Sequence, residues 1–221
     1  MAEVRARAPG KIILSGEHAV VHGSTAVAAA IDLYTHVSFR LDPPLPPGLA
    51  SLPPSIFSIT LYGLTLSAHV TGGMIQFRSG ELTHIKSISP LRMLITNTKV
   101  GRNTKALVAG VSERASRHPD AMASVFTAVD FISKELSAII QSPAQDDISI
   151  TAREEKIEEL MEMNQGLLQC MGVSHAAIEM VLRITLKYKL ASKLTGAGGG
   201  GCVLTLMPTC MLLALCHLIK S

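Results

Sequence analysis

Apolar residues recur every three or four positions through much of the second half of the chain, which is the pattern of amphipathic helices. One such stretch covers residues 122–139, and a second covers residues 157–171 with glutamates on its polar side. A third follows Ser174, a residue type that commonly caps helices. The apolar positions of the first stretch are Met122, Val125, Phe126, Val129, Ile132, Leu136 and Ile139. The pattern therefore predicts at least three helices beyond residue 105.

Short apolar runs between turn residues predict strands elsewhere in the chain. They lie at residues 12–14, 74–77, 91–96 and 202–207. The run of small residues at 25–31 fits either a tightly packed helix or a backbone that another segment approaches closely. Strands, then helices, then a strand favour an α+β fold over a regular βαβ alternation.

Composition and charge narrow the class of protein. The 221 residues are 48% hydrophobic and 17% charged, which excludes wholesale disorder. The net charge of +3 and the scarcity of aromatic residues argue against nucleic acid as a partner. We therefore expect a globular chain with a sizeable core and no nucleic-acid partner.

Cysteine usage and apolar length indicate the compartment. The four cysteines show no CxxC spacing, and they indicate thiols of a reducing compartment, not a disulfide frame or a zinc site. The apolar stretches at residues 56–70 and 211–219 are shorter than the about 20 residues of a membrane-spanning helix. Polar residues interrupt the N-terminus where a signal peptide needs an apolar core. We expect a cytoplasmic protein without a membrane partner.

Glycine occupies five of the six positions 196–201. The backbone N–H groups of such a loop can approach an anion without interference from Cβ atoms. The string satisfies G-x-G-x-x-G, but its expected order of helix, loop and strand differs from that of a dinucleotide fold, and the chain has no Walker motif. The loop is therefore either a tight connector or a phosphate-binding loop, and the flanking Lys193 and Thr195 favour phosphate.

A second polar segment lies near the N-terminus. Lys11 follows a Pro-Gly turn and can either reach a phosphate or remain a surface lysine. Glu17 and His18 can act as acid–base groups or metal ligands, or they can be polar groups of a loop or core. His18 and His22 would share one face of a helix, but the glycines at either end of this segment disfavour a helix.

Three ordered segments resemble the mevalonate kinase family, within the GHMP small-molecule kinase superfamily. Residues 8–23, APGKIILSGEHAVVHG, are similar to the family's first signature. Residues 94–108, LITNTKVGRNTKALV, together with Met163-Asn164-Gln165, are similar to its C-terminal half. Residues 193–202, KLTGAGGGGC, match its third signature. The sequence is most similar to plant members of the family, and the similarity covers about residues 3–40 and 72–207.

This resemblance implies a two-domain α+β kinase that uses ATP and Mg²⁺ to phosphorylate the primary hydroxyl of mevalonate, in isoprenoid and sterol synthesis. Lys11 matches the family lysine beside the transferring phosphate and the catalytic carboxylate. Glu17 and His18 match residues that line the substrate side. The phosphate loop matches four residues, Gly196, Ala197, Gly198 and Gly199.

The chain also departs from the family pattern. The second signature, a Gly-Leu-Gly-Ser-Ser loop around the triphosphate, is absent, as are the stretches with the Mg²⁺-binding Glu and the catalytic Asp. The metal ligands are therefore unknown. No Asp or Glu occurs between Asp42 and Glu81, and residues 41–72 match nothing in the family. Residues 209–221 form an apolar tail where the family continues into a helix and a closing strand.

These departures predict two incomplete domains. Residues 1–90 would be an N-terminal remnant, and residues 91–221 a helix-rich C-terminal sandwich without its last strand. Exposed apolar faces and open sheet edges would make the chain less stable than a complete kinase and prone to aggregation. Three hypotheses follow: an active kinase, an inactive product of splicing or a faulty gene model, or a module that pairs with an intact kinase. A homodimer is a further expectation.

Overall fold

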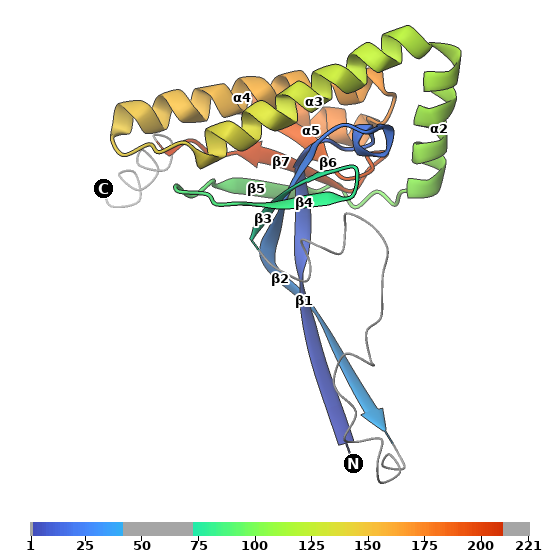
Figure 1. Ribbon diagram of the computed structural model, residues 1–221, viewed down its shortest axis with the longest axis vertical. Helices are drawn as coiled ribbons and strands as arrows, with labels where there is room; N and C mark the ends of the chain where they lie inside the picture. The colour runs from blue at the N-terminus through green and yellow to red at the C-terminus, as the bar shows by residue number, and fades with distance from the viewer. Residues whose placement is uncertain (1, 42–72, 210–221) are drawn as a thin grey trace. The chain divides into compact units, whose positions relative to one another are not determined.

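A computed structural model of the chain describes residues 2–41 and 73–209 (Figure 1). Most of the unmatched segment 41–72 and of the tail 209–221 lies outside the described residues. The chain divides into two compact units, Met1–Ile12 with Ala29–Gly73, and Ile13–Ala28 with Met74–Ser221. The family domains predicted at residues 1–90 and 91–221 are a different division, and they stay a prediction.

The first unit contains most of two long strands, β1 (Ala2–Ser15) and β2 (Ala26–Leu41). A Cβ added to Gly10 would lie 3.1 Å from Cγ1 of Ile31, so the glycine lets the two strands pack closely. The guanidinium of Arg7 lies over the ring of Tyr34, 4.7 Å from its centroid, in cation–π geometry. The small-residue run at 25–31 therefore belongs to a strand, and its interpretation as a helix is wrong.

The described strands form two sheets, and β1 and β2 belong to the first. Strands β3 (Met74–Arg78) and β4 (Glu81–Ile85) pair antiparallel, with Arg78 opposite Glu81, and the first sheet has the order β1-β2-β3-β4. The second sheet has the order β5-β7-β6, with β5 (Met93–Asn97) and β6 (Ser192–Thr195) both antiparallel to β7 (Cys202–Leu206). The expected strands at 74–77, 91–96 and 202–207 are confirmed, whereas β6 was not expected.

Four helices of the second unit follow the apolar periodicity of the sequence: α2 (Thr104–Arg117), α3 (Pro119–Gln141), α4 (Asp147–Cys170) and α5 (Ala176–Lys187). Helix α3 packs against α2 and α4, while α4 and α5 pack on β6 (Figure 1). The predicted helical stripe is confirmed, since its Met122, Phe126 and Val129 lie in the core. The core also contains residues of other elements, among them Val111, Leu168, Met171, Ile178, Leu194 and Val203.

Side chains define where these helices begin. Asn103 accepts a hydrogen bond from the N–H of Ala106 at the start of α2, and Asp146 and Ser149 form a capping box at the start of α4. The expected cap Ser174 is displaced by one position, because His175 accepts the N–H of Ala177 and is the N-cap of α5. The Ser174 hydroxyl instead donates to Glu179 at 2.5 Å.

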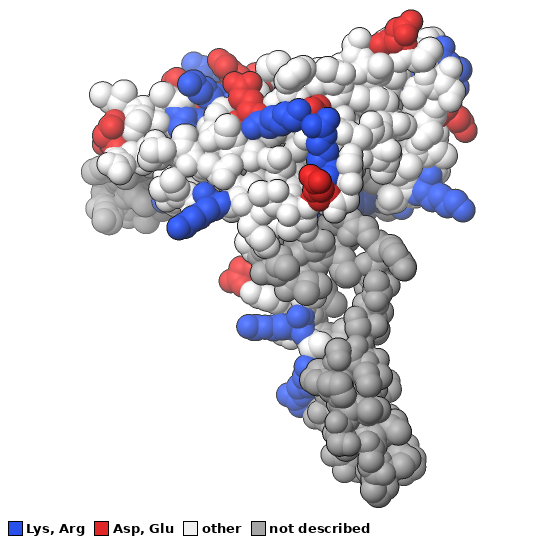
Figure 2. Space-filling model, viewed as in Figure 1, with Lys and Arg blue, Asp and Glu red and all other residues white. Residues whose placement is uncertain are grey.

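The charge distribution on the surface and the length of the helices concern nucleic-acid and membrane partners. On the face shown in Figure 2, the acidic and basic side chains of the second unit are interspersed. In the part of the chain that the structure describes, no helix is long and apolar enough to cross a membrane. The α+β fold expected from the sequence is confirmed, and its helices and second sheet provide the framework of the site described next.

Candidate active site

The turn between β1 and β2 carries Glu17 and His18. Gly16 precedes them with φ +98°, and a Cβ at this position would lie 2.4 Å from the Cα of Ala26. The backbone is therefore approached closely here, as one interpretation of the small-residue run expected. One 3₁₀ turn, η1 (Ala19–His22), follows and ends at Gly23 in the left-handed conformation. The glycines thus limit this segment to a single turn, as the sequence suggested.

Helix α3 holds this turn from one side. The Ser24 hydroxyl donates to the carbonyl oxygen of Phe126 at 2.8 Å, and the ring of His22 stacks on the Phe126 ring with centroids 4.2 Å apart. The N–H and the hydroxyl of Thr25 both donate to Oδ1 of Asp130 at 2.7 Å. The other carboxylate oxygen of Asp130 pairs with Lys134 at 2.6 Å. Burial alone would raise the pKa of Asp130, but the hydrogen bonds from Lys134 and Thr25 outweigh it and lower the pKa to about 2.

The low pKa of Asp130 predicts a pH dependence of stability. A carboxyl group with a lowered folded-state pKa stabilises the fold above its unfolded pKa, and this contribution is lost as the pH falls toward the folded value of about 2. We expect the wild type to lose about 2 kcal/mol more unfolding free energy than Asp130→Asn between about pH 4 and pH 2. Urea titrations at each pH measure the difference. Parallel pH profiles for the two proteins would contradict the assignment.

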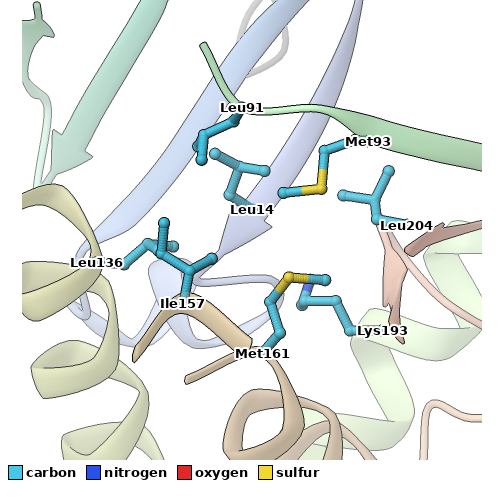
Figure 3. Close-up of a pocket in the computed structure, with 8 residues that line it drawn as sticks. All are labelled: Leu14, Leu91, Met93, Leu136, Ile157, Met161, Lys193 and Leu204. Atoms are coloured by element: carbon cyan, nitrogen blue, oxygen red, sulfur yellow. The ribbon is translucent and has the colours of Figure 1, made fainter. Parts of the chain in front are cut away.

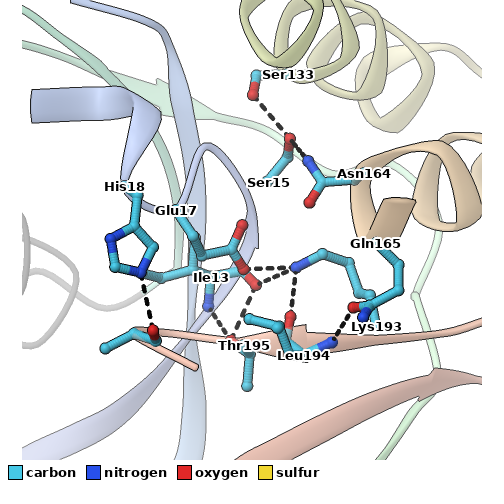
Figure 4. Close-up of polar contacts among 11 residues, drawn as sticks. Ile13, Ser15, Glu17, His18, Ser133, Asn164, Gln165, Lys193, Leu194 and Thr195 are labelled. Carbon is cyan, nitrogen blue, oxygen red and sulfur yellow. Dashed lines mark hydrogen bonds and ion pairs between the residues drawn. The ribbon is translucent and has the colours of Figure 1, made fainter. Parts of the chain in front are cut away.

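Glu17 forms a buried ion pair with Lys193 of β6. Nζ of Lys193 lies 2.5 Å from Oε1 of Glu17, and the two side chains are 0% and 1% exposed (Figure 4). The ammonium also donates to the carbonyl oxygens of Leu194 at 2.7 Å and Ile13 at 3.4 Å. Burial lowers the pKa of Lys193, and the charge of Glu17 opposes this effect. The expectation that Lys193 offers a cation to a phosphate is therefore wrong, because its charge is used inside the fold.

The stem of Lys193 lies among apolar side chains. Figure 3 shows a small pocket in which, among the described residues, the lysine is the only charged lining residue. The other lining residues are Leu14, Leu91, Met93, Leu136, Ile157, Met161 and Leu204. The lysine thus places its methylene groups in the core and its ammonium at Glu17.

The glycine loop connects β6 to β7, so the order is strand, loop, strand, and the expected order of helix, loop, strand is wrong. The N–H of Gly199 donates to Val173 at 2.8 Å, and that of Gly201 donates to Val100 at 3.2 Å. The carbonyl oxygen of Gly201 accepts the N–H and the hydroxyl of Thr98, each at 2.8 Å. The second half of the loop is therefore fixed to the protein.

The first half of the loop differs in its hydrogen bonds. Within residues 2–41 and 73–209, the N–H groups of Ala197 and Gly198 have no acceptor. Arg102 lies against both ends of the loop, because a Cβ at Gly196 would be 3.4 Å from its Nη1 and one at Gly201 only 2.1 Å away. Sequence reasoning missed this arginine, although it lies in the middle segment that resembles the family. A guanidinium and two N–H groups are thus the groups here that suit an anion.

Two further contacts join the N-terminal turn to the glycine loop. Nε2–H of His18 donates to the carbonyl oxygen of Ala197 at 2.8 Å (Figure 4). The Thr195 hydroxyl donates to the carbonyl oxygen of Ile13 at 3.0 Å and accepts the N–H of Ile13 at 2.9 Å. The expectation that Thr195 offers its hydroxyl to a phosphate is therefore wrong. The structure does bring together Glu17, His18 and Ala197, which the sequence placed in two separate motifs.

The predicted site residues fall in different units. Glu17, His18 and the loop residues Gly196, Ala197, Gly198 and Gly199 all belong to the second unit. Lys11 is a half-buried residue of β1 in the first unit, and its role beside the phosphate stays a prediction. The substrate-side roles of Glu17 and His18 also stay predictions.

Buried polar atoms surround the Glu17–Lys193 pair. Asn164 of α4 donates to the Ser15 hydroxyl at 2.7 Å, and that hydroxyl is 2.8 Å from the hydroxyl of Ser133. Gln165 accepts the N–H of Leu194 at 2.9 Å. Four buried atoms have no hydrogen-bond partner among the described residues: Oε2 of Glu17, Nδ1 of His18, Oδ1 of Asn164 and Nε2 of Gln165. Helix α4 thus adds polar groups to the site that were recognised only as part of a family segment.

The resemblance implies a Mg²⁺ ion. Across the described residues, no three His, Cys, Asp or Glu side chains gather in a way that could hold a metal ion. Residues 43–72 contain no Asp or Glu. Because Mg²⁺ in kinases is held by one or two carboxylates together with the substrate phosphates, these observations identify no Mg²⁺ ligand among the described residues.

Comparisons with known proteins identify the family of the chain. The sequence-family model described as GHMP kinases C terminal matches residues 150–209. The mevalonate kinase of Arabidopsis thaliana is 41% identical over an alignment of 349 positions, gaps included, which covers 94% of this chain and 91% of the plant protein. The mevalonate kinase of Mus musculus is 38% identical over 149 residues, and there the alignment spans 66% of this chain but only 36% of the mouse protein.

Among solved structures, L. major mevalonate kinase in complex with R-mevalonate has a similar fold. Its TM-score is 0.74 at 17% identity, covering 98% of this chain and 91% of that one. The 41% identity to the plant enzyme, together with the matched C-terminal segment and the fold, shows that the chain is a GHMP kinase. Within that class, the chain belongs to the mevalonate kinase family. The family resemblance and the GHMP-kinase-like fold read from the sequence are confirmed, while the predicted truncation stays a prediction.

Proposed function

We propose that the chain performs the mevalonate kinase reaction, the ATP-dependent phosphorylation of the primary hydroxyl of mevalonate. The observation that carries the proposal is the 41% identity to the Arabidopsis enzyme across 91% of that enzyme's length. The joining of the Glu17–His18 turn to the glycine loop through His18 and Ala197 supports it, because both signatures then contribute to one site. We also propose a cytoplasmic location.

Phosphoryl transfer depends mainly on positioning and on stabilising charge. The N–H groups of Ala197 and Gly198 and the guanidinium of Arg102 suit the phosphates of ATP, and ATP would supply the phosphoryl group. Nε2–H of His18 is already used by Ala197, so His18 offers substrate only its buried Nδ1 atom. Lys11 would add positive charge beside the transferring phosphate. The family uses Mg²⁺, but the described residues identify no ligand for it, and we assign it no role.

A second candidate function rests on the alignment with the plant enzyme. An alignment of 349 positions exceeds the 221 residues of this chain, so at least 128 positions (349 minus 221) of the plant enzyme face gaps. The missing Gly-Leu-Gly-Ser-Ser loop agrees with such a gap. The alternative is therefore an inactive chain that pairs with an intact kinase. If the chain is instead an active kinase, we propose that it pairs with a second copy of itself.

Two measurements separate these functions. A coupled assay of ADP release with purified chain, ATP and mevalonate should show turnover that depends on mevalonate if the first proposal holds. Sizing chromatography of the chain mixed with an intact mevalonate kinase should show a hetero-oligomer if the second holds. Turnover near that of a complete enzyme would reject the inactive alternative. Absence of turnover by folded chain would reject the first proposal.

Lys11→Met should lower the turnover number at least about a hundredfold, since the lost ammonium would stabilise charge that develops in the transition state. The ADP-release assay measures the effect, and circular dichroism checks that the variant is folded. Lys86→Met, which replaces an exposed lysine outside the site, is the matched control. An unchanged rate for Lys11→Met would show that its assignment is wrong.

A further inference from the structure

Four residue pairs join residues 13–18 to residues 193–197. Ile13 pairs with Thr195 through two hydrogen bonds of 2.9 and 3.0 Å, and its carbonyl oxygen also accepts a hydrogen bond from Lys193 at 3.4 Å. Lys193 pairs with Glu17 at 2.5 Å, and His18 pairs with Ala197 at 2.8 Å. Of these pairs, the ion pair between Lys193 and Glu17 joins two full charges. We propose that Lys193 is a positioning residue, which sets through Glu17 where His18 meets the glycine loop.

The placement of the two charges supports this role. Glu17 directly precedes His18, whose backbone has the unusual φ of 58°. Lys193 lies three residues before Gly196, where the loop begins. A displacement of Glu17 would therefore move His18 and break its hydrogen bond to Ala197. The loop beyond Ala197 is held separately, because Gly199 and Gly201 donate to Val173 and Val100.

The surroundings of Lys193 argue against a role in stability alone. Its stem packs among Leu14, Met161 and Leu204, so a methionine would fill the same space (Figure 3). Buried ion pairs can often be replaced by apolar residues of similar volume without loss of stability, although removing one partner is destabilising. If stability were the only role of the pair, the double variant Glu17→Leu/Lys193→Met would keep the hydrogen bond from His18 to Ala197.

The experiment compares the full-length wild type with this double variant by ¹⁵N NMR of labelled histidine. The ring ¹⁵N shifts report which nitrogen carries the proton, and the signals of His18 are assigned with His18→Gln, since the chain has eight histidines. In the wild type we expect the proton on Nε2. In the double variant we expect a mixture of tautomers and faster exchange of the ring proton, with a melting temperature close to that of the wild type. The amides of Gly199 and Gly201 should remain protected, which shows that the rest of the loop is intact.

Lys156→Met, which changes an exposed lysine of α4, is the control and should leave the His18 signals unchanged. Wild-type His18 signals in a folded double variant would overturn the proposal. So would a wild-type spectrum without the Nε2-protonated form. If the double variant does not fold, Glu17→Gln/Lys193→Met provides the same comparison, because it also removes both charges while the glutamine keeps the volume of Glu17.

The kinetic part of the test rests on the proposed function. Misplacing a positioned group by about 1 Å can cost about a hundredfold in rate, and we expect a loss of that size in kcat with a smaller change in KM for mevalonate. An unchanged kcat in the double variant would count against the proposal. If the wild type shows no turnover, the proposed function fails, while the NMR comparison still decides the role of Lys193.

Discussion

Glu17→Leu should lower the free energy of unfolding by about 3–5 kcal/mol, because it leaves the ammonium of Lys193 buried without a counter-charge. The lysine cannot reach water, since its side chain is 0% exposed. Its two carbonyl partners, Ile13 and Leu194, offer partial charges only. Urea titration at neutral pH measures the loss. Glu113→Leu, at an exposed position of α2, is the matched control and should change stability by less than about 0.5 kcal/mol.

Adding Lys193→Met to Glu17→Leu should restore most of the lost stability. The second substitution removes the unpaired charge, and the apolar pocket around the lysine stem accepts a methionine. The two single losses and the double loss together form a double-mutant cycle that measures the coupling of the pair. A double variant as unstable as the sum of its singles would show that the two residues act independently, and the buried pair would then have no energetic role.

The helical part of the fold was predictable from the sequence because its signal is local. The stripe of Met122, Phe126 and Val129 repeats at helical spacing, and the caps lie within a few residues of the helix starts. Strand β6 carried no such signal. Three of its four residues, Ser192, Lys193 and Thr195, are polar, and yet all four are buried. Burial of polar residues by distant partners leaves no pattern in the strand itself.

The site was predictable only in part for the same reason. Family resemblance identified Glu17, His18 and the glycine loop, but local reasoning assigned Lys193 to a phosphate. Its true partner is 176 positions away in the sequence. Arg102, which lies against the loop instead, follows a glycine in an exposed segment and has no local feature that marks it. A pairing of charges across such a distance depends on how the fold places β6 next to the turn that follows β1, which single-sequence patterns do not encode.

Gly198→Ala should lower the free energy of unfolding by about 2–4 kcal/mol, through strain in the glycine loop. The backbone at Gly198 has φ +74°, and a Cβ there would lie 2.0 Å from the carbonyl oxygen of Val173. That oxygen accepts the N–H of Gly199 at 2.8 Å, so relief of the clash must break this hydrogen bond. Urea titration measures the stability, and amide exchange at Gly199 should accelerate.

The same substitution at Gly166 should have the opposite sign. Gly166 lies inside α4, and a Cβ there meets nothing within 4 Å, so alanine should raise the stability by roughly 0.5–1 kcal/mol through its better helix propensity. The comparison separates the general effect of adding a methyl group from the close approach of Val173. Equal stabilities for the two variants would mean that the loop can move away from Val173 at no cost, and the close approach at Gly198 would then not constrain the loop.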